Sequence, residues 1–341
     1  IGIIKMNVLI TGCAGLIGSN LCNWLLDNIE NITIIGVDNL SGGYKVNIPL
    51  PVKFYEIDLC DYKSVNEIFT NHNIEYIFHF AAYAAECLSP FIRTYNYSNN
   101  LLATTNLVNM AIKHKIKRFV FTSSMAVYGK GDGKLPYTEE TPKNPVDPYG
   151  VAKLSCEMDL KIASEQHGIE YCIIRPHNVY GVNQNIWDRY RNVLGIWMYQ
   201  IINGEDITIY GDGEQVRAFT YVDDILQPLW NAAVYEKAKN QEINLGGIHE
   251  ISINNVAKMV LDQCDDNPFY NTQIKYLESR HEIKKAWCSY KKSIDLLDFK
   301  MNTTLYHGIR KMWRWVLKQP KRDRHKWSEF EIDDKIYSYW K

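Results

Sequence analysis

The 341-residue chain lacks the features that mark membrane, secreted or nucleic-acid-binding proteins. It has no apolar run near the roughly 18 residues of a membrane-spanning helix, and no signal-peptide pattern at its start. Its 38 Lys and Arg residues against 39 Asp and Glu give a net charge of −1, so no overall positive field would attract nucleic acid. We therefore expect a cytoplasmic protein with neither a membrane nor a nucleic acid as partner.

Two kinds of site are also missing from the sequence. The eight cysteines include no C-x-x-C pair and have no histidines at zinc-ligand spacing, so we expect buried thiols in a reducing compartment and no metal site. No G-x-x-x-x-G-K-[ST] segment occurs, so the sequence has no phosphate-binding loop that would indicate a kinase or nucleotide hydrolase of the P-loop type.

The first half of the chain alternates β-rich and helical segments. Apolar runs predict strands at 8–10, 33–37, 52–57, 77–80, 119–122 and 171–174, and helices at 16–29, 65–69, 101–112 and from the Asp147 cap to Gly168. This alternation predicts an α/β fold with a doubly wound, Rossmann-type parallel sheet. After Pro176 the alternation fades. We expect residues 1–176 to bind a dinucleotide, and residues 177–341 to form mainly a smaller α/β substrate lobe, with some segments returning to the first domain.

A glycine-rich turn follows the first predicted strand. Gly12, Gly15 and Gly18 form G-x-x-G-x-x-G, which lets a pyrophosphate approach the backbone at the N-terminus of a helix, although an ordinary strand-to-helix turn also uses glycine. Asp38 ends the second strand 20 residues after Gly18, where a carboxylate accepts ribose hydroxyls and repels a 2′-phosphate; it could also be a turn residue. Asp58, after the third strand, would reach adenine or cap a helix. This pattern favours NAD over NADP.

Tyr149 and Lys153 lie one helical turn apart and so share a face. Lowering a tyrosine pKa from near 10 to near 7 takes about 3 units, or roughly 4 kcal/mol, which a lysine and a positive nicotinamide ring can supply together. Ser124 follows the strand at 119–122, at the sheet edge where such folds bind ligands. Taken alone, Y-x-x-x-K also arises by chance on exposed helices, and a serine after a strand often forms a turn.

In their order along the chain, these motifs resemble those of the extended short-chain dehydrogenase/reductase superfamily. Within it, the chain is similar to the NAD-dependent sugar epimerase/dehydratase family and most of all to the UDP-glucose 4-epimerases. The resemblance covers almost the whole chain and is carried by residues 11–18, 38–41, 79–82, 100, 123–129, 149–153, 175–181 and 217–224.

The resemblance implies a role for each matching residue. Tyr149 would be the catalytic base, Lys153 its electrostatic partner and a ligand of the nicotinamide ribose, and Ser124 the contact to the reacting hydroxyl. Asn178 would hold the sugar nucleotide, and Arg217 and Arg280 its diphosphate. The implied cofactor contacts are Gly12, Gly15, Leu16, Ile17, Gly18, Asp38, Asn39, Asp58, Leu59, Phe80, Ala81, Ala82, Asn100, Tyr149, Lys153 and Pro176.

The resemblance also implies an activity. Met125 and Ala126 stand where related dehydratases carry an acidic pair, which argues against dehydration and decarboxylation. We therefore expect a UDP-hexose 4-epimerase that interconverts UDP-glucose and UDP-galactose with tightly bound NAD, as a homodimer. The alternatives are an epimerase for N-acetylated or uronate sugars, an NAD(P)-dependent reductase of the same fold, and a non-catalytic NAD-sensing module.

Two positions bear on the sugar. Val182 and Asn183 replace the Pro-Arg that relatives often carry. Trp287 aligns with a position that limits room at C2 of the sugar and would disfavour N-acetyl groups, but it could equally be part of the lobe core.

Overall fold

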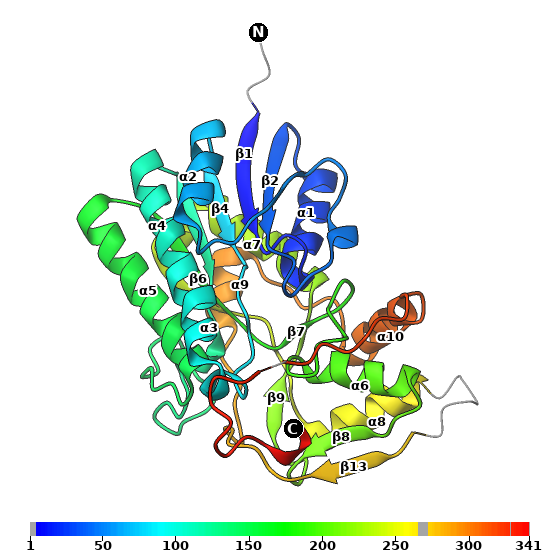
Figure 1. Cartoon of the computed structure of the whole chain (residues 1–341). Helices are drawn as coiled ribbons and strands as arrows, with labels where there is room; N and C mark the ends of the chain where they lie inside the picture. Colours follow the sequence, from blue (N-terminus) through cyan, green and yellow to red (C-terminus); the bar gives the residue numbers. More distant parts are fainter. Residues whose placement is uncertain (1–4, 265–271, 328, 341) are drawn as a thin grey trace.

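The centre of the fold is a seven-stranded sheet in which every neighbouring pair of strands is parallel (Figure 1). The computed structural model describes residues 5–264, 272–327 and 329–340. The strand order is β11-β6-β5-β4-β1-β2-β3. The strands span β1 Met6–Thr11, β2 Ile32–Asp38, β3 Lys53–Glu56, β4 Tyr76–His79, β5 Arg118–Thr122, β6 Tyr171–Pro176 and β11 Gln241–Leu245. The predicted doubly wound α/β fold is confirmed.

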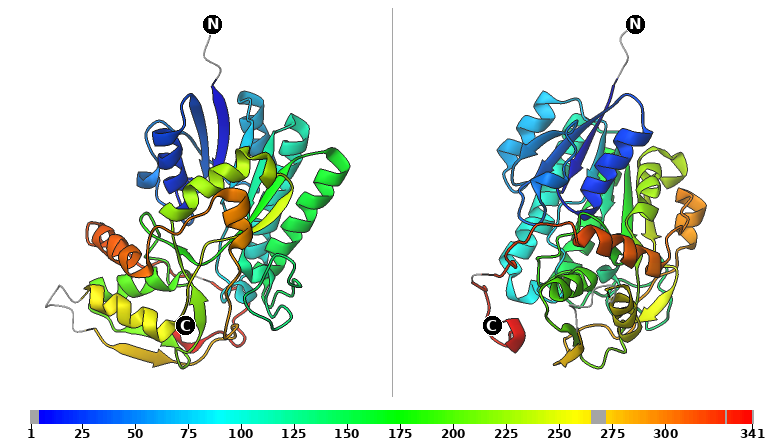
Figure 2. Two further views of the ribbon diagram at one scale, coloured as in Figure 1. Left: turned by 180° about the vertical axis from the view of Figure 1, so that it is seen from behind. Right: turned by 90° about the vertical axis from the view of Figure 1, so that its right-hand side faces the viewer.

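Helices cover both faces of the sheet, as Figure 2 shows from the side. On one face lie α2 (Tyr62–Asn71), α4 (Ala103–His114) and α5 (Pro148–His167), and on the other α1 (Leu16–Asn28), α7 (Asp223–Val234) and α9 (Lys291–Leu297). Successive residues of one strand enter different cores: Val8 and Ile10 of β1 pack into one, and Leu9 packs into the other. Burial on both faces explains why these strands are apolar without alternation.

The helix α5 begins and ends where the sequence predicts. The Asp147 carboxylate accepts the N–H of Gly150 at 2.8 Å, Pro148 occupies the first turn, and Gly168 closes the helix with φ +73°. The preceding helical run is longer than predicted, because α3 (Arg93–Tyr97) and a π-helical turn (Ser98–Leu102) lead directly into α4. The sequence hides this extension because Asn96 and Asn100 are polar yet buried.

The second half of the chain lies mostly beyond the carboxyl ends of the strands (Figure 1). It contains α6 (Val193–Ile202), α8 (Ile253–Cys264) and α10 (Leu305–Val316), with three short strand pairs: β7 (Val179–Tyr180) with β10 (Thr220–Tyr221), β9 (Val216–Ala218) with β12 (Glu250–Ser252), and β8 (Ile207–Tyr210) with β13 (Ile274–Leu277). Short 3₁₀ turns span Lys45–Asn47, Ser89–Phe91, Met125–Val127, Glu236–Ala238 and Ser338–Trp340. From this half, β11 pairs with β6 and extends the central sheet. The domain boundary at residue 176 stays a prediction.

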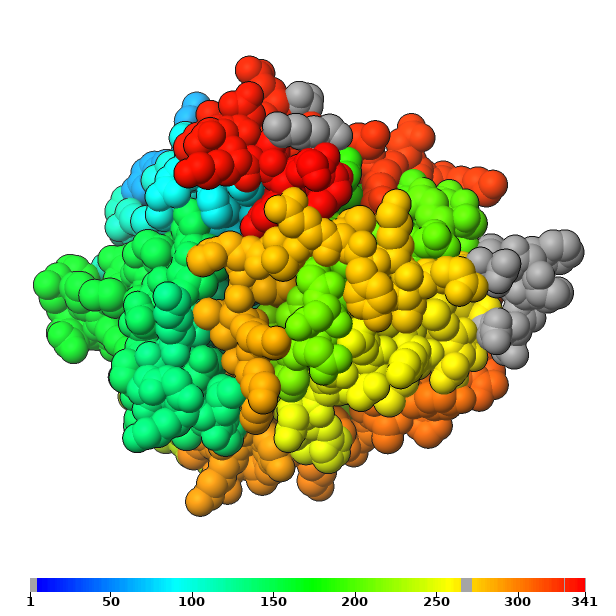
Figure 3. Space-filling model, turned by 90° about the horizontal axis from the view of Figure 1, so that it is seen from below, coloured from blue at the N-terminus to red at the C-terminus, as the bar shows by residue number. Residues whose placement is uncertain are grey.

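The C-terminal segment, residues 329–340, crosses the lower face of the molecule, next to the segment around residue 90 and residues 272–290 (Figure 3). Its Trp340 packs edge-on against Phe91 with ring centroids 6.1 Å apart. The Glu331 carboxylate accepts the N–H groups of Thr94 at 2.7 Å and Tyr95 at 2.8 Å. These contacts bind the segment to the 3₁₀ turn at Ser89–Phe91 and to the start of α3. No helix in the described ranges combines the length and apolar character needed to cross a membrane.

Candidate active site

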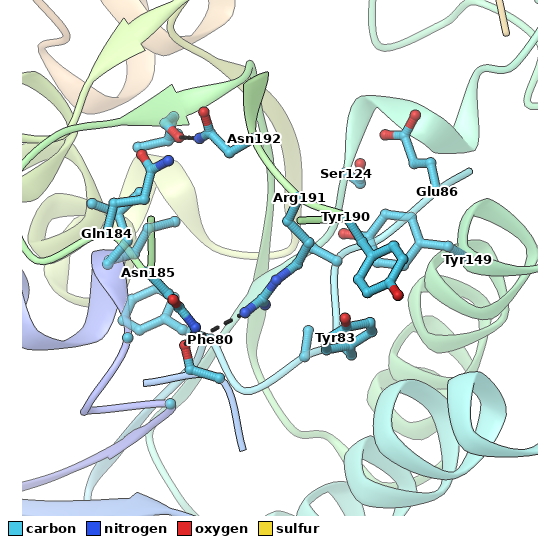
Figure 4. A pocket seen from close by; sticks show the side chains of 18 of the residues that line it. Phe80, Tyr83, Glu86, Ser124, Tyr149, Gln184, Asn185, Tyr190, Arg191 and Asn192 are labelled. Atoms are coloured by element: carbon cyan, nitrogen blue, oxygen red, sulfur yellow. Dashed lines mark hydrogen bonds between the residues drawn. The ribbon is translucent and has the colours of Figure 1, made fainter. Parts of the chain in front are cut away.

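A cavity of about 490 Å³ opens at the carboxyl ends of the central strands, between the sheet and the second half of the chain. Figure 4 shows Glu86, Ser124 and Tyr149 along one side of this cavity, with Gln184 and Asn192 opposite them. Of the predicted site residues, the following line the cavity: Gly12, Gly15, Leu16, Ile17, Gly18, Asp38, Asn39, Asp58, Leu59, Phe80, Ala81, Ala82, Ser124, Tyr149, Lys153, Pro176, Asn178, Arg217 and Arg280. One fold therefore brings together residues that are up to 268 positions apart in the sequence.

The glycine turn is packed too tightly for side chains at two of its three positions. A Cβ on Gly12, which has φ +70°, would lie 2.8 Å from the Ala81 nitrogen, and one on Gly18 would lie 2.2 Å from the Gly12 carbonyl oxygen. Gly15 is less crowded, since its nearest neighbour would be 3.4 Å away. Gly15 also precedes α1, and no side chain in the described part of the chain caps that helix. The first N–H groups of α1 thus remain available for an anion.

Asp38 joins the end of β2 to this turn. Its Oδ2 accepts the N–H of Ala14 at 3.0 Å and its Oδ1 accepts the N–H of Leu40 at 2.8 Å. Burial raises the pKa of Asp38, and the two backbone N–H donors oppose that rise. Each carboxylate oxygen has a second lone pair for a ribose hydroxyl. Asp58 is exposed at the cavity edge, where its Oδ1 accepts the N–H of Cys60 at 2.8 Å.

These features fit an adenine dinucleotide. The crowded glycines bring bare backbone to the cavity wall, and the uncapped start of α1 suits a pyrophosphate. Asp38 faces the same cavity and suits two ribose hydroxyls rather than a phosphate.

Tyr149, Lys153 and Ser124 meet at the ends of β5 and α5. The Tyr149 hydroxyl is hydrogen-bonded to Ser124, whose Oγ also accepts the N–H of Ala126 at 3.1 Å. The Lys153 Nζ donates to the Thr122 carbonyl at 2.8 Å and lies 5.9 Å from the centroid of the Tyr149 ring. Both side chains are buried. The constellation predicted from the sequence is thus assembled within one wall of the cavity.

The charges around Tyr149 include a carboxylate that the sequence analysis did not identify. Burial raises the pKa of Tyr149, the negative charge of Glu86 adds to the rise, and the hydrogen bond with Ser124 opposes it. Burial also lowers the pKa of Lys153 to about 8. The Lys153 ammonium is directed at the Thr122 carbonyl and the face of Phe121, 4.9 Å from that ring centroid. The chain alone therefore does not make Tyr149 acidic, and forming the phenolate needs a further positive charge in the cavity.

Two arginines border the far end of the cavity. The Arg217 Nη2 donates to the Glu282 carboxylate at 3.0 Å, so a carboxylate already partners this guanidinium. The Arg280 guanidinium stacks on Tyr210 at 3.2 Å from the ring centroid, and its Nε donates to the Tyr339 hydroxyl at 3.3 Å. The Arg280 Nη2 is buried without a hydrogen-bond acceptor among the described residues. A buried donor with no acceptor is suited to an anionic ligand.

Asn100 lies behind the cavity wall rather than on it. It is buried, its Oδ1 accepts the N–H of Tyr83 at 3.0 Å, and its Nδ2 donates to the Asn96 Oδ1 at 2.9 Å. Asn99, its neighbour in the π-helical turn, lines the cavity instead. Asn100 therefore holds the loop after β4 in place, and its contact with the cofactor stays a prediction.

Trp287 also lies away from the cavity. Together with Pro136 and Tyr290 it lines a separate depression, and its carbonyl accepts the N–H of Tyr137 at 3.0 Å. It therefore sets no limit on the group at C2 of a sugar, and the expectation that it disfavours N-acetyl sugars loses its basis. Val182 and Asn183, the departure from relatives, contact α1: the Asn183 Nδ2 donates to the Ser19 Oγ at 3.1 Å.

The sequence analysis missed several residues that line the cavity. Arg191 projects into its centre, where its Nε donates to the Asp188 carboxylate at 2.9 Å (Figure 4). Gln184, Tyr190 and Asn192 come from the same segment. This segment has no regular structure between β7 and α6, and no sequence period marks which of its side chains face inward. Glu86 was missed as well, although the motif at 79–82 lies just before it.

A buried hydrogen-bond network lies behind the wall of the cavity that carries Ser124 and Tyr149. The Arg175 guanidinium donates to the Glu157 carboxylate at 2.8 Å and 2.6 Å, and to the Tyr128 hydroxyl at 2.8 Å. Ser123, next to Ser124, donates to the same carboxylate at 2.5 Å. This network ties β6 and α5 to the end of β5. Among the described residues, no group of three or more His, Cys, Asp or Glu side chains is arranged to hold a metal ion.

Comparisons with known proteins agree with this site. The model of the NAD dependent epimerase/dehydratase family matches residues 8–246. A UDP-glucose 4-epimerase from Thermotoga maritima, solved with UDP-glucose, is 31% identical with a TM-score of 0.84, covering 92% of this chain and 99% of its own. A UDP-N-acetylglucosamine 4-epimerase from Methanobrevibacter ruminantium, in complex with UDP-N-acetylmuramic acid, is 30% identical with a TM-score of 0.84, covering 93% and 100%.

A third similar structure contains both a sugar nucleotide and the cofactor. The UDP-glucuronic acid 4-epimerase from Bacillus cereus, in complex with UDP-glucuronic acid and NAD, is 26% identical with a TM-score of 0.81, covering 92% of this chain and 99% of its own. The protein belongs to the NAD-dependent epimerase/dehydratase family. The predicted family and the predicted cofactor, NAD, are confirmed. The sugars named for these three structures differ, so family membership alone does not identify the substrate.

Proposed function

We propose that the protein is a UDP-hexose 4-epimerase that interconverts UDP-glucose and UDP-galactose while NAD stays bound. The observation that carries the proposal is the meeting of Tyr149, Ser124 and Lys153 in one cavity with the glycine turn. Met125, which lines the same cavity, and Ala126 carry no acid or base with which to eliminate water from the sugar. A reaction that begins and ends at C4 needs only one proton-transfer group.

In this proposal, bound NAD supplies the reversible two-electron oxidation at C4 and a positive charge beside the phenol. Tyr149 removes the proton of the C4 hydroxyl, directly or through Ser124, and returns it to the product. Lys153 holds the negative phenolate by its charge. Between the two proton transfers the 4-keto sugar rotates in the cavity, so that its other face points to the nicotinamide. Arg217 and Arg280 hold the diphosphate during this rotation. Substrate and product have the same oxidation state, so no second substrate is consumed.

The test is incubation of the purified protein with UDP-glucose, UDP-galactose, UDP-N-acetylglucosamine and UDP-glucuronate, without added NAD, with products resolved by NMR. We expect C4 epimers of the hexoses. Tyr149→Phe should lower kcat about a thousand-fold, the range of general acid–base contributions, and leave UDP binding unchanged. Tyr306→Phe removes a hydroxyl from the exposed Tyr306 on α10 and serves as the matched control. Absence of any C4 epimer would overturn the proposal.

One observation keeps a second substrate in view. Because Trp287 lies outside the cavity, an N-acetyl group at C2 meets no obstacle from that ring. An epimerase for UDP-N-acetylhexosamines is therefore the alternative, and the same panel of sugars distinguishes it. A reductase of the same fold would convert substrate only when a nicotinamide cofactor is added in stoichiometric amount.

We also propose a homodimer formed through α4 and α5. The outer face of α5 exposes Val151, Met158 and Ile162, which are spaced seven and four residues apart and so form one stripe. Leu102, the last residue of the π-helical turn before α4, is 47% exposed as well. Exposed apolar side chains grouped in this way are typical of interfaces. Light scattering should give the mass of two chains for the native protein and of one chain for Met158→Asp.

A further inference from the structure

Glu86 is an acidic side chain in the reactive part of the cavity that the mechanism above does not use. It lies on the loop between β4 and α3, on the same side of the cavity as Ser124 and Tyr149 (Figure 4). Within the described ranges, its carboxylate has no hydrogen-bond or ion-pair partner, and the side chain is open to the cavity. A carboxylate placed in this way is free to contact a ligand.

The position of Glu86 relative to the catalytic phenol is fixed by Ser89. The Ser89 Oγ donates to the Glu86 carbonyl at 2.7 Å and accepts the N–H of Tyr149 at 3.2 Å. One buried hydroxyl thus links the backbone of both residues. The charge of Glu86 also raises the pKa of Tyr149, so a sugar with its C4 at Tyr149 would lie near Glu86.

Two of the cations that line the cavity are already paired with carboxylates. Arg217 is paired with Glu282 at 3.0 Å, and Arg191 is paired with Asp188 at 2.9 Å. Asp147, at the start of α5, adds a further negative charge near Glu86. Loss of water inside the cavity raises the pKa of Glu86 to about 7, the charge of Asp147 adds to this rise, and the positive charge of Arg217 opposes it. These two arginines therefore already have carboxylate partners, whereas Lys153 and Arg280, which also line the cavity, have no carboxylate partner within the described ranges.

We propose that Glu86 selects the sugar: it accepts a hydrogen bond from a hydroxyl or N–H group of a hexose and excludes sugars that carry a carboxylate. This inference rests on the proposed epimerase function. C6 is bonded to C5, the neighbour of C4, so its substituent lies beside the reacting carbon. Because the sugar rotates in the cavity during the reaction, a C6 carboxylate would approach the Glu86 carboxylate in at least one of the two orientations of the sugar. Like charges brought together out of water are strongly unfavourable.

The experiment compares equilibrium binding of UDP, UDP-glucose and UDP-glucuronate to the purified NAD-containing protein at about pH 8.5, where Glu86 is ionised. We expect the native protein to bind UDP-glucose about a hundred-fold more tightly than UDP-glucuronate, as one close like-charge contact implies. Glu86→Gln should reduce that ratio at least about ten-fold and leave UDP binding unchanged. Glu86→Asp keeps the charge and should keep the exclusion, so the two variants separate charge from loss of structure. Glu67→Gln, on the exposed face of α2, removes the same charge at a distance.

The outcomes distinguish this inference from the proposed function. Equal affinity of the native protein for both sugars, or an unchanged ratio in Glu86→Gln, overturns the role of Glu86 alone. The expected ratio in a protein that produces no C4 epimer supports the role of Glu86 and overturns the epimerase. No binding of any UDP-sugar overturns both.

Discussion

The buried pair of Arg175 and Glu157 gives the sharpest prediction for stability. Both side chains are at most 1% exposed, and the guanidinium donates to both carboxylate oxygens, at 2.8 Å and 2.6 Å. Arg175→Met removes the cation and leaves the Glu157 carboxylate buried, with only Ser123 as a donor among the described residues. Removing one partner of a buried pair costs about 3–5 kcal/mol, and we expect about 4 kcal/mol here.

Replacing the carboxylate of the pair should lower the free energy of unfolding by less than replacing the guanidinium does. Glu157→Leu leaves Arg175 with the Tyr128 hydroxyl at 2.8 Å and with the Glu242 carboxylate, so we expect a loss of about 2 kcal/mol. The double variant buries no unpaired charge at either position, and Glu242 keeps its ion pair with Lys161. We expect it to lie within about 1 kcal/mol of the native protein, because apolar replacements of buried pairs are often neutral.

Urea unfolding of the four proteins, followed by circular dichroism, measures these differences wherever the m-values agree. The two single losses sum to about 6 kcal/mol, so the double variant should show a coupling energy of about 5 kcal/mol. A loss below about 1 kcal/mol in Arg175→Met, or a double variant as unstable as that sum, would refute the reasoning.

Three further predictions concern the cavity. Gly18→Ala places a Cβ 2.2 Å from the Gly12 carbonyl oxygen and should yield protein without bound NAD. Chromatography of the cofactor released on denaturation measures the NAD content, and a full NAD content would contradict this prediction. Burial lowers the pKa of Lys153 from 10.5 to about 8. Between these two pH values the unfolded state binds more protons than the folded state. The free energy of unfolding should therefore rise with pH in this range, by up to roughly 3 kcal/mol. Lys153→Met should lose this rise in parallel denaturation series, and an identical pH dependence would argue against it. Arg280→Met removes the buried Nη2 donor and should weaken UDP binding by calorimetry about ten-fold to a hundred-fold, the value of one or two charge-assisted hydrogen bonds; unchanged affinity would place the diphosphate elsewhere.

Local signals made the first half of the fold predictable. The central strands are buried on both faces, so they appear as apolar runs, and the ends of α5 carry a cap and a stop that act within a few residues. The extension of the helical run through α3 and the π-helical turn was not predictable in this way. Asn96 and Asn100 are satisfied by partners from other segments, Pro148 and Tyr83, and polar residues with distant partners resemble solvent-exposed ones in a sequence.

Prediction of the candidate catalytic residues depended on their spacing. Tyr149 and Lys153 lie on one helix, so their geometry follows from a four-residue interval, and Ser124 follows directly from the end of a strand. Arg191 and Glu86 have no such interval, because each belongs to an irregular loop whose path depends on contacts with remote parts of the chain.

The same distinction explains why the full set of charges around Tyr149 could not be predicted from the sequence. Spacing shows that Lys153 is near Tyr149, but the pKa of a phenol depends on every charge around it and on how much water it has lost. The structure adds burial and the carboxylate of Glu86, both of which raise that pKa, and directs the Lys153 ammonium to the Thr122 carbonyl. In the proposed mechanism, the phenolate therefore has to be stabilised in the cavity with NAD bound. This requirement would couple proton removal to cofactor binding, because Tyr149 stays protonated until a positive charge lies beside it.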